Sequence, residues 1–143
     1  MAKRKPVSPE AAAKHEADVA LAGRFDDLFA QAQEAEQTLR AAQANGASLE
    51  ELHRAGKRLD SALTDVMRAA FAAQRAEIGP LGYDDRIYRR KAMATSPVRA
   101  WTMEAERLLT LRESHRLTGI VRLPRQSEAA PGTAGSAAST INA

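Results

Sequence analysis

The sequence predicts an all-α fold: a long antiparallel helical hairpin of the coiled-coil type, a third helix, and flexible tails at both ends. Alanine, the residue with the highest helix propensity, supplies 31 of the 143 residues. Apolar residues recur over two long stretches with alternating steps of three and four, which is the spacing of a coiled-coil seam. Combinations that favour helix starts precede both stretches and a third, shorter one.

The first helix is predicted over residues 9–44. Ser8 suits the N-cap position, Pro9 the first helical position, and Glu10 the positive end of the helix dipole. An unbroken heptad pattern follows, made up of Leu21, Phe25, Leu28, Ala32, Ala35, Leu39 and Ala42. Gly46 ends the helix, because glycine readily adopts the left-handed conformation of a C-terminal cap.

The second helix is predicted over residues 48–78, directly after a short turn. Ser48 and Glu51 have the spacing of a capping box. The seam of this helix consists of Leu49, Leu52, Gly56, Leu59, Leu63, Val66, Ala70 and Ala73. Two matching seams joined by so short a turn predict an antiparallel hairpin.

The third helix is predicted near residues 97–117, where a Ser-Pro pair again precedes the apolar residues. One face of this helix changes from apolar to cationic towards its C-terminal end. We expect the helix to dock through Trp101 and Leu108. It would then bring Arg112 and Arg116 to carboxylates or phosphates.

The predicted core is thin, because alanine contributes little buried area. The residues expected to form packing contacts or interfaces are Leu21, Phe25, Leu28, Leu39, Leu52, Leu59, Leu63, Val66, Phe71, Trp101 and Leu108. Phe29, Met67 and Phe71 form a second apolar stripe, which either the third helix or a neighbouring subunit would cover. The thin core and the exposed seams lead us to expect a homo-oligomer.

Composition divides the chain into four segments with different charge. These are a basic N-terminal tail (1–7), the hairpin (8–78), a basic loop followed by the third helix (79–125), and a low-complexity C-terminal tail (126–143). The net charge is only +3, but residues 8–85 carry 8 basic and 14 acidic side chains, whereas residues 86–125 carry 10 and 3. The chain therefore has an acidic stretch at residues 8–85 and a basic stretch, or basic back, at residues 86–125.

The basic back begins with the segment YDDRIYRRKA at residues 83–92. The candidate contact residues are Arg86, Tyr88, Arg89, Arg90 and Lys91, together with Arg112 and Arg116 on the third helix. Arginine and lysine pair with phosphates, and tyrosine rings stack on bases, so the segment is compatible with nucleic-acid binding. Neutralisation of an acidic protein surface is the alternative, and the sequence leaves both open.

We find no pattern of catalytic, metal-binding or cofactor-binding residues in the sequence. The absence of cysteine excludes disulfides, zinc–cysteine sites and thiol catalysis. His15, His53 and His115 lack the spacing of metal ligands or of a nucleophile and its base, so we expect them at the surface. No stretch approaches the roughly 20 apolar residues that span a bilayer, and the basic start lacks the apolar run of a secretory signal. We therefore expect no enzyme activity, no cofactor, no small-molecule substrate and no membrane partner.

The layout of the whole chain resembles that of small structural proteins of tailed bacteriophages, of the head–tail connector and neck type. The resemblance is carried by the short basic start at Lys3–Lys5, the helical bundle, the arginine-rich stretch 86–125 and the small, polar end at 139–143. It implies assembly into rings, tails that thread along neighbouring subunits near packaged DNA, and a location in the virion. The chain is also similar to small terminase subunits, although no helix-turn-helix stands near its N-terminus.

The sequence therefore leads us to expect a non-enzymatic structural or assembly protein in a larger oligomeric complex. Its partners would be further copies of itself and other structural proteins of the assembly, in a virion or otherwise in the cytoplasm. The alternative is a nucleic-acid-binding protein, with DNA as partner, in packaging or regulation.

Overall fold

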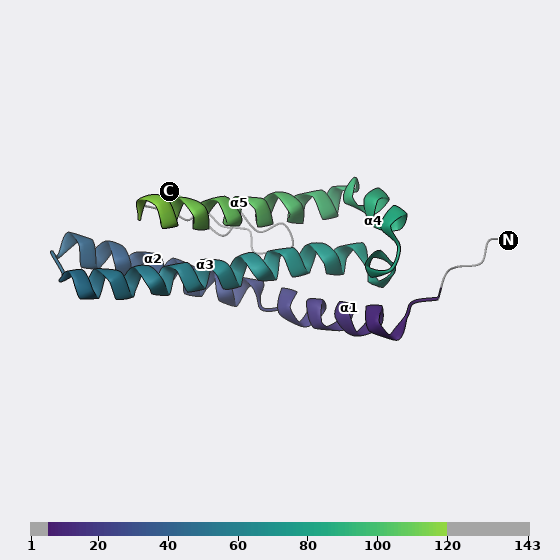
Figure 1. Ribbon diagram of the computed structural model, residues 1–143, viewed down its shortest axis with the longest axis horizontal. Helices are drawn as coiled ribbons and strands as arrows, with labels where there is room; N and C mark the ends of the chain where they lie inside the picture. Colours follow the sequence, from purple (N-terminus) through teal and green to yellow (C-terminus); the bar gives the residue numbers. More distant parts are fainter. Residues whose placement is uncertain (1–5, 120–143) are drawn as a thin grey trace, which may run out of the picture.

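The computed structural model describes residues 6–119 and is all-helical over this range (Figure 1). Its elements are α1 (Pro9–Ala22), α2 (Phe25–Ala44), α3 (Leu49–Ile78), the short 3-10 helix η1 (Pro80–Tyr83), α4 (Arg86–Met93) and α5 (Ser96–Thr118). The all-α prediction is thereby confirmed. Residues 1–5 of the predicted basic tail (1–7), residues 120–125 and the low-complexity tail at 126–143 lie outside the described residues.

The longest helix, α3, is the central element, and its neighbours run in the opposite direction on either side (Figure 1). It has 30 residues, which corresponds to about 45 Å. The end of α2 is joined to the start of α3 by a four-residue turn, whereas His15 of α1 contacts the carbonyl of Ala76 near the end of α3 at 3.3 Å. The first two helices therefore form the first arm of a hairpin and α3 forms the second.

Helix α5 returns along the other side of α3. Near the end of α3, Gln74 donates a hydrogen bond to Thr102 at 2.7 Å. Towards the start of α3, Arg116 contacts Asp60 at 2.7 Å. These two contacts, at opposite ends of α5, show that the helices are antiparallel over most of their length.

The prediction of one continuous helix over residues 9–44 is wrong at Gly23 and Arg24, where α1 ends and α2 begins. The N–H of Arg24 bonds to the carbonyl of Leu21, three residues back, at 3.0 Å. Glycine inside a helix costs about 1 kcal/mol relative to alanine, so the break falls where the helix is intrinsically weakest. Directly after the break, the buried side chain of Phe25 packs edge-on against Trp101, with ring centroids 5.2 Å apart. This contact fixes the start of α2.

The segment predicted as a basic loop is also more regular than expected, because it contains η1 and α4. Gly79 ends α3 with a φ of 101°, a conformation that favours glycine. The Asp85 carboxylate then caps α4 by accepting hydrogen bonds from the backbone N–H groups of Ile87 and Tyr88, both at 3.0 Å.

One core joins α2, α3 and α5. Its large buried side chains are Phe25, Leu28, Phe29, Leu39, Leu59, Leu63, Val66 and Leu108, with alanines at 32, 35, 69, 70 and 105 between them. Leu21, Leu52, Phe71 and Trp101 pack against its edge, half-buried. The second apolar stripe is therefore covered by α5 of the same chain. Leu49, the first residue of the predicted second seam, is instead exposed.

Among residues 6–119, the helices are either too short or too polar to cross a lipid bilayer.

Candidate binding surfaces

Helix α4 presents most of the predicted basic contact residues on one exposed surface. We call Arg86, Ile87, Tyr88, Arg90 and Lys91 the α4 surface. The side chains of Ile87 and Tyr88 are 69% and 41% exposed, and no residue of α4 is buried. Within residues 6–119, no carboxylate forms an ion pair with any of the three cations of this surface. Apolar, aromatic and cationic groups thus stand together in solvent.

Arg89, the remaining predicted contact residue of α4, points back towards the bundle. Its Nη1 donates a hydrogen bond to the carbonyl of Gly82 in η1 at 3.3 Å. Its side chain also lines a hollow that is bordered by Lys14 of α1 and Arg75 of α3. Arg89 therefore lies between this hollow and a second one, which it lines together with Arg86, Ile87 and Arg90.

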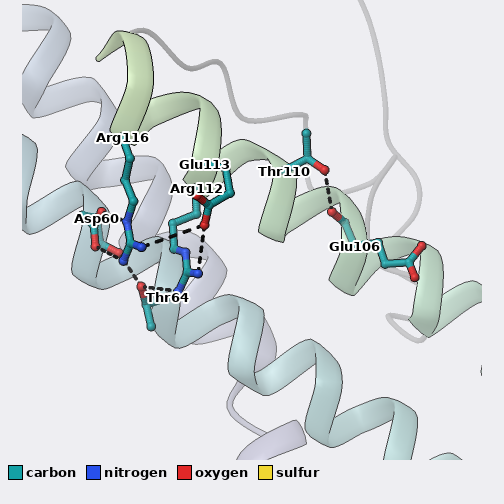
Figure 2. Close-up of polar contacts among 7 residues, drawn as sticks. All are labelled: Asp60, Thr64, Glu106, Thr110, Arg112, Glu113 and Arg116. Carbon is teal, nitrogen blue, oxygen red and sulfur yellow. Dashed lines mark hydrogen bonds and ion pairs between the residues drawn. The ribbon is translucent and has the colours of Figure 1, made fainter.

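Arg112 and Arg116 lie far from α4, in the C-terminal half of α5, and both face α3 (Figure 2). Arg116 binds Asp60 with two hydrogen bonds of 2.7 and 3.1 Å, and hydrogen bonding by this guanidinium lowers the pKa of the Asp60 carboxyl. Arg112 donates to Thr64 at 3.4 Å and to Glu113 at 3.0 Å. These arginines hold α5 on α3, so the seven predicted contact residues do not form one surface.

A polar cluster that the sequence did not indicate joins α1, α3 and η1. Arg75 donates two hydrogen bonds to Asp18, at 2.8 and 3.0 Å, and the hydroxyl of Tyr83 donates to the same carboxylate. Burial raises the pKa of the Asp18 carboxyl. The hydrogen bonds from Arg75 and Tyr83 and the charge of Arg75 together lower this pKa by more than burial raises it, so the net shift is downward. Burial, followed by the hydrogen bond to Asp18, raises the pKa of Tyr83. Arg75 and Tyr83 lie 57 and 65 positions after Asp18 in the sequence, so helical periodicity does not indicate that the three residues meet.

The expectation that all three histidines lie at the surface is wrong for His115. This residue is buried between α5 and α3, with its Nε2 2.9 Å from the carbonyl of Gly56. His15 is half-buried with its ring edge-on to Tyr83, and His53 is exposed.

Glu104 is a second buried polar residue, 2% exposed, on the face of α5 that also carries Trp101 and Leu108. One carboxylate oxygen accepts a hydrogen bond from Arg107 at 2.9 Å, whereas Oε2 has no hydrogen-bond partner among residues 6–119. Burial raises the pKa of this carboxyl, and Arg107 opposes the shift only in part. The burial of Glu104 could have been predicted from the sequence, because position 104 lies on the same helix face as the apolar residues 101, 105 and 108.

The side chains of residues 6–119 do not bring three or more histidine, aspartate or glutamate residues into a group that could hold a metal ion. No known protein family, curated protein or solved structure matches the chain. The surfaces described above are therefore the basis for proposing its function.

Proposed function

We propose that this chain is a non-enzymatic structural protein of a larger oligomeric assembly and that it docks through the α4 surface. The observation that carries the proposal is the exposed pair Ile87 and Tyr88, set among three cations that have no carboxylate partner within residues 6–119. Aromatic residues and arginine are enriched in the centres of protein interfaces. The unpaired charge favours a partner with an acidic surface. A bacteriophage particle, with a head–tail connector or neck role, is the assembly that the resemblance of the sequence favours.

The closed core changes how such an assembly would be held together. Helix α5 already covers the hairpin, so neighbouring subunits are not needed to complete the core. Contacts between subunits would instead involve surfaces of a finished bundle. Such contacts resemble those of non-obligate complexes, in which a few anchoring residues carry most of the affinity.

Two further exposed leucines support a head-to-tail arrangement. Leu49 at the start of α3 and Leu117 near the end of α5 are 86% and 85% exposed. Both lie at the end of the bundle opposite α4 (Figure 1). Two different surfaces at opposite ends are what a heterologous interface requires, and such interfaces close into rings when the rotation permits.

Sedimentation velocity of the full chain at several concentrations tests the proposal. We expect species larger than the monomer whose population grows with concentration. The variant Ile87→Ser should shift the population back to monomer. Met103→Ser on α5 is the matched control, because Met103 is 67% exposed and lies away from both sites. A chain that stays monomeric throughout, or equal effects of the two variants, would count against assembly through α4.

Nucleic-acid binding in packaging or regulation is a second candidate. It is favoured by the exposed ring of Tyr88 and by the three cations that form no ion pair within residues 6–119. Each phosphate neutralised should contribute about −0.9 to the slope of log affinity against log salt for duplex DNA. Three contacts therefore predict a slope near −3. The triple variant Arg86→Glu, Arg90→Glu, Lys91→Glu should abolish binding to random duplex DNA. If the unaltered chain does not bind such DNA at low salt, this candidate is excluded.

A further inference from the structure

A hollow of about 480 Å³ lies where α1, α3, η1 and α4 meet, next to the α4 surface. This volume is within the range of pockets that hold small organic ligands. The side chains that decide its chemistry are Lys14, Asp18, Arg75, Ile78, Tyr83 and Arg89. They come from four different elements, so the hollow exists only in the folded chain.

The hollow has an excess of positive charge that its own carboxylate does not cancel. Asp18 is already engaged by two hydrogen bonds from Arg75 and one from Tyr83. Within residues 6–119, neither Lys14 nor Arg89 forms an ion pair. The guanidinium of Arg89 donates from Nη1 to Gly82, which leaves its remaining N–H groups for a ligand.

One wall of the hollow is apolar and held in place. The Tyr83 ring is fixed by its hydroxyl on Asp18 and by the edge-on His15 ring, with centroids 6.3 Å apart. Ile78 is 6% exposed and supports η1 from below. A rigid ring next to a group of cations suits a ligand that combines a flat apolar body with an anionic group.

We propose that this hollow binds a phosphomonoester whose body is apolar or aromatic. A phosphomonoester is close to a dianion at neutral pH. Two negative charges match Lys14 and Arg89, which form no ion pair among the described residues, better than the single charge of a carboxylate does. The planar fork of Arg89 fits phosphate oxygens, and Lys14 adds a point charge. This inference is independent of the proposed assembly role and assigns a ligand class that the sequence did not predict.

Isothermal titration of the full chain with three probes tests the inference: phenyl phosphate, inorganic phosphate and benzoate. We expect phenyl phosphate to bind more tightly than either of the others, because only it offers both the ring and the dianion. Arg89→Gln should weaken its binding at least about tenfold, the effect of losing one strong charge-assisted hydrogen bond. Arg99→Gln is the matched control, since Arg99 is an exposed arginine of α5 that does not line the hollow.

Lys14→Gln provides a second variant in case the Arg89 substitution disturbs the contact of α4 with η1. Circular dichroism of each variant checks that the helices are intact. Absence of phenyl phosphate binding overturns the inference, as does equal weakening by Arg89→Gln and Arg99→Gln. Benzoate binding as tightly as phenyl phosphate also overturns it, since the site would then select the ring and a single charge.

Discussion

Two glycines contact α3 or lie within it, and they differ in what a methyl group would meet. A Cβ added at Gly82 would lie 2.4 Å from Cγ2 of Ile78, inside the contact distance of any two carbons. A Cβ added at Gly56 would lie 3.9 Å from Cε1 of His115, an ordinary contact. Gly82 is therefore required for the close approach of η1 to α3, whereas Gly56 is a helix-interior glycine that tolerates a side chain.

The first prediction is that alanine has opposite effects at these two positions. Gly82→Ala should lower the free energy of unfolding by about 1–3 kcal/mol, the usual cost of overpacking. Gly56→Ala should raise it by roughly 0.4–1 kcal/mol, because alanine restricts the unfolded chain and favours helix. Urea unfolding followed by circular dichroism measures both. If both variants changed the free energy of unfolding equally and in the same direction, the close approach of Gly82 to Ile78 would not require glycine at position 82.

The second prediction concerns Glu104, whose buried Oε2 has no hydrogen-bond partner in the described part of the chain. Because the folded-state pKa is raised, the ionised form costs stability at neutral pH. That cost is complete above the folded-state pKa and absent below the unfolded-state pKa, which is near 4.3. Glu104→Gln should thus raise the free energy of unfolding at pH 7 by roughly 0.5–1 kcal/mol, despite the loss of the ion pair with half-exposed Arg107.

Unfolding of both proteins in urea at pH 7 and below pH 4 checks the Glu104 prediction. The advantage of the glutamine variant should disappear at the lower pH, where the native glutamate is protonated in both states. A variant that is less stable than the native chain by the same amount at both pH values would contradict it.

At the scale of elements, the starts of α1 and α3 were predictable from the sequence, but the helix break at Gly23 was not. The Ser-Pro pair predicted the region of α5 but not its cap, because Thr95 occupies the N-cap position without a side-chain capping bond and Ser96 is already helical. Ser8 accepts the hydrogen bond of an N-cap from Ala11 at 3.0 Å, and Ser48 with Glu51 forms the predicted capping box. These signals are local, so the sequence shows them directly. The heptad pattern, by contrast, continues through Gly23 and conceals the break there. Helix α4 has no buried face, which leaves Asp85 as its main sequence signal.

Helix α1 depends on polar contacts more than any other long element, because Ala11 is its only buried residue. The backbone N–H of Ser8 donates to Asp84 at 3.2 Å, and His15 contacts the carbonyl of Ala76 at 3.3 Å. Asp18 supplies the strongest contact, with three donors on one carboxylate. None of these pairs is predictable from periodicity, since each joins positions more than 60 residues apart or, for Asp18 and Arg75, 57 apart.

The third prediction is that Asp18→Asn loosens α1 while the rest of the bundle stays intact. The contact of α1 with the rest of the bundle should lose roughly 1 kcal/mol of stability, since Arg75 is nearly half-exposed and solvent screens its charge. Amide hydrogen exchange should accelerate in α1 and remain unchanged in α2, α3 and α5. Asp27→Asn, on the exposed face of α2, is the control and should change neither the stability of α1 nor its amide hydrogen exchange.

The same contact predicts a dependence on pH. The folded-state pKa of Asp18 lies below its unfolded value of about 3.9. Its contribution is therefore present above pH 3.9 and is lost as the pH falls through the folded-state pKa. The difference between the native chain and Asp18→Asn should narrow over that acidic range. A difference that is constant from pH 7 to pH 2 would contradict the assignment.

At the scale of the whole molecule, sequence periodicity identified the side chains of the core but not how the chain closes it. The heptad residues of α2 and α3 meet as expected, and the stripe on α5 contains Leu108, which is fully buried. Whether α5 or a second subunit covered the hairpin depended on the path of residues 79–95. That path is set by contacts between distant elements, such as Gly82 on Ile78 and Tyr83 on Asp18. The hollow proposed to bind a phosphomonoester arises from the same contacts.

The fourth prediction follows from a single core shared by α2, α3 and α5. Leu108→Ala should lower the free energy of unfolding by about 2–5 kcal/mol, because the cavity opens where all three helices meet. Trp101 fluorescence and the helical circular dichroism signal should shift to the same lower urea midpoint, since loss of α5 exposes the hairpin seam. Met103→Ala, at an exposed position of the same helix, should change stability by no more than about 0.5 kcal/mol. If the fluorescence transition moved while the circular dichroism transition stayed in place, α5 would be an independent element and the hairpin would be stable without it.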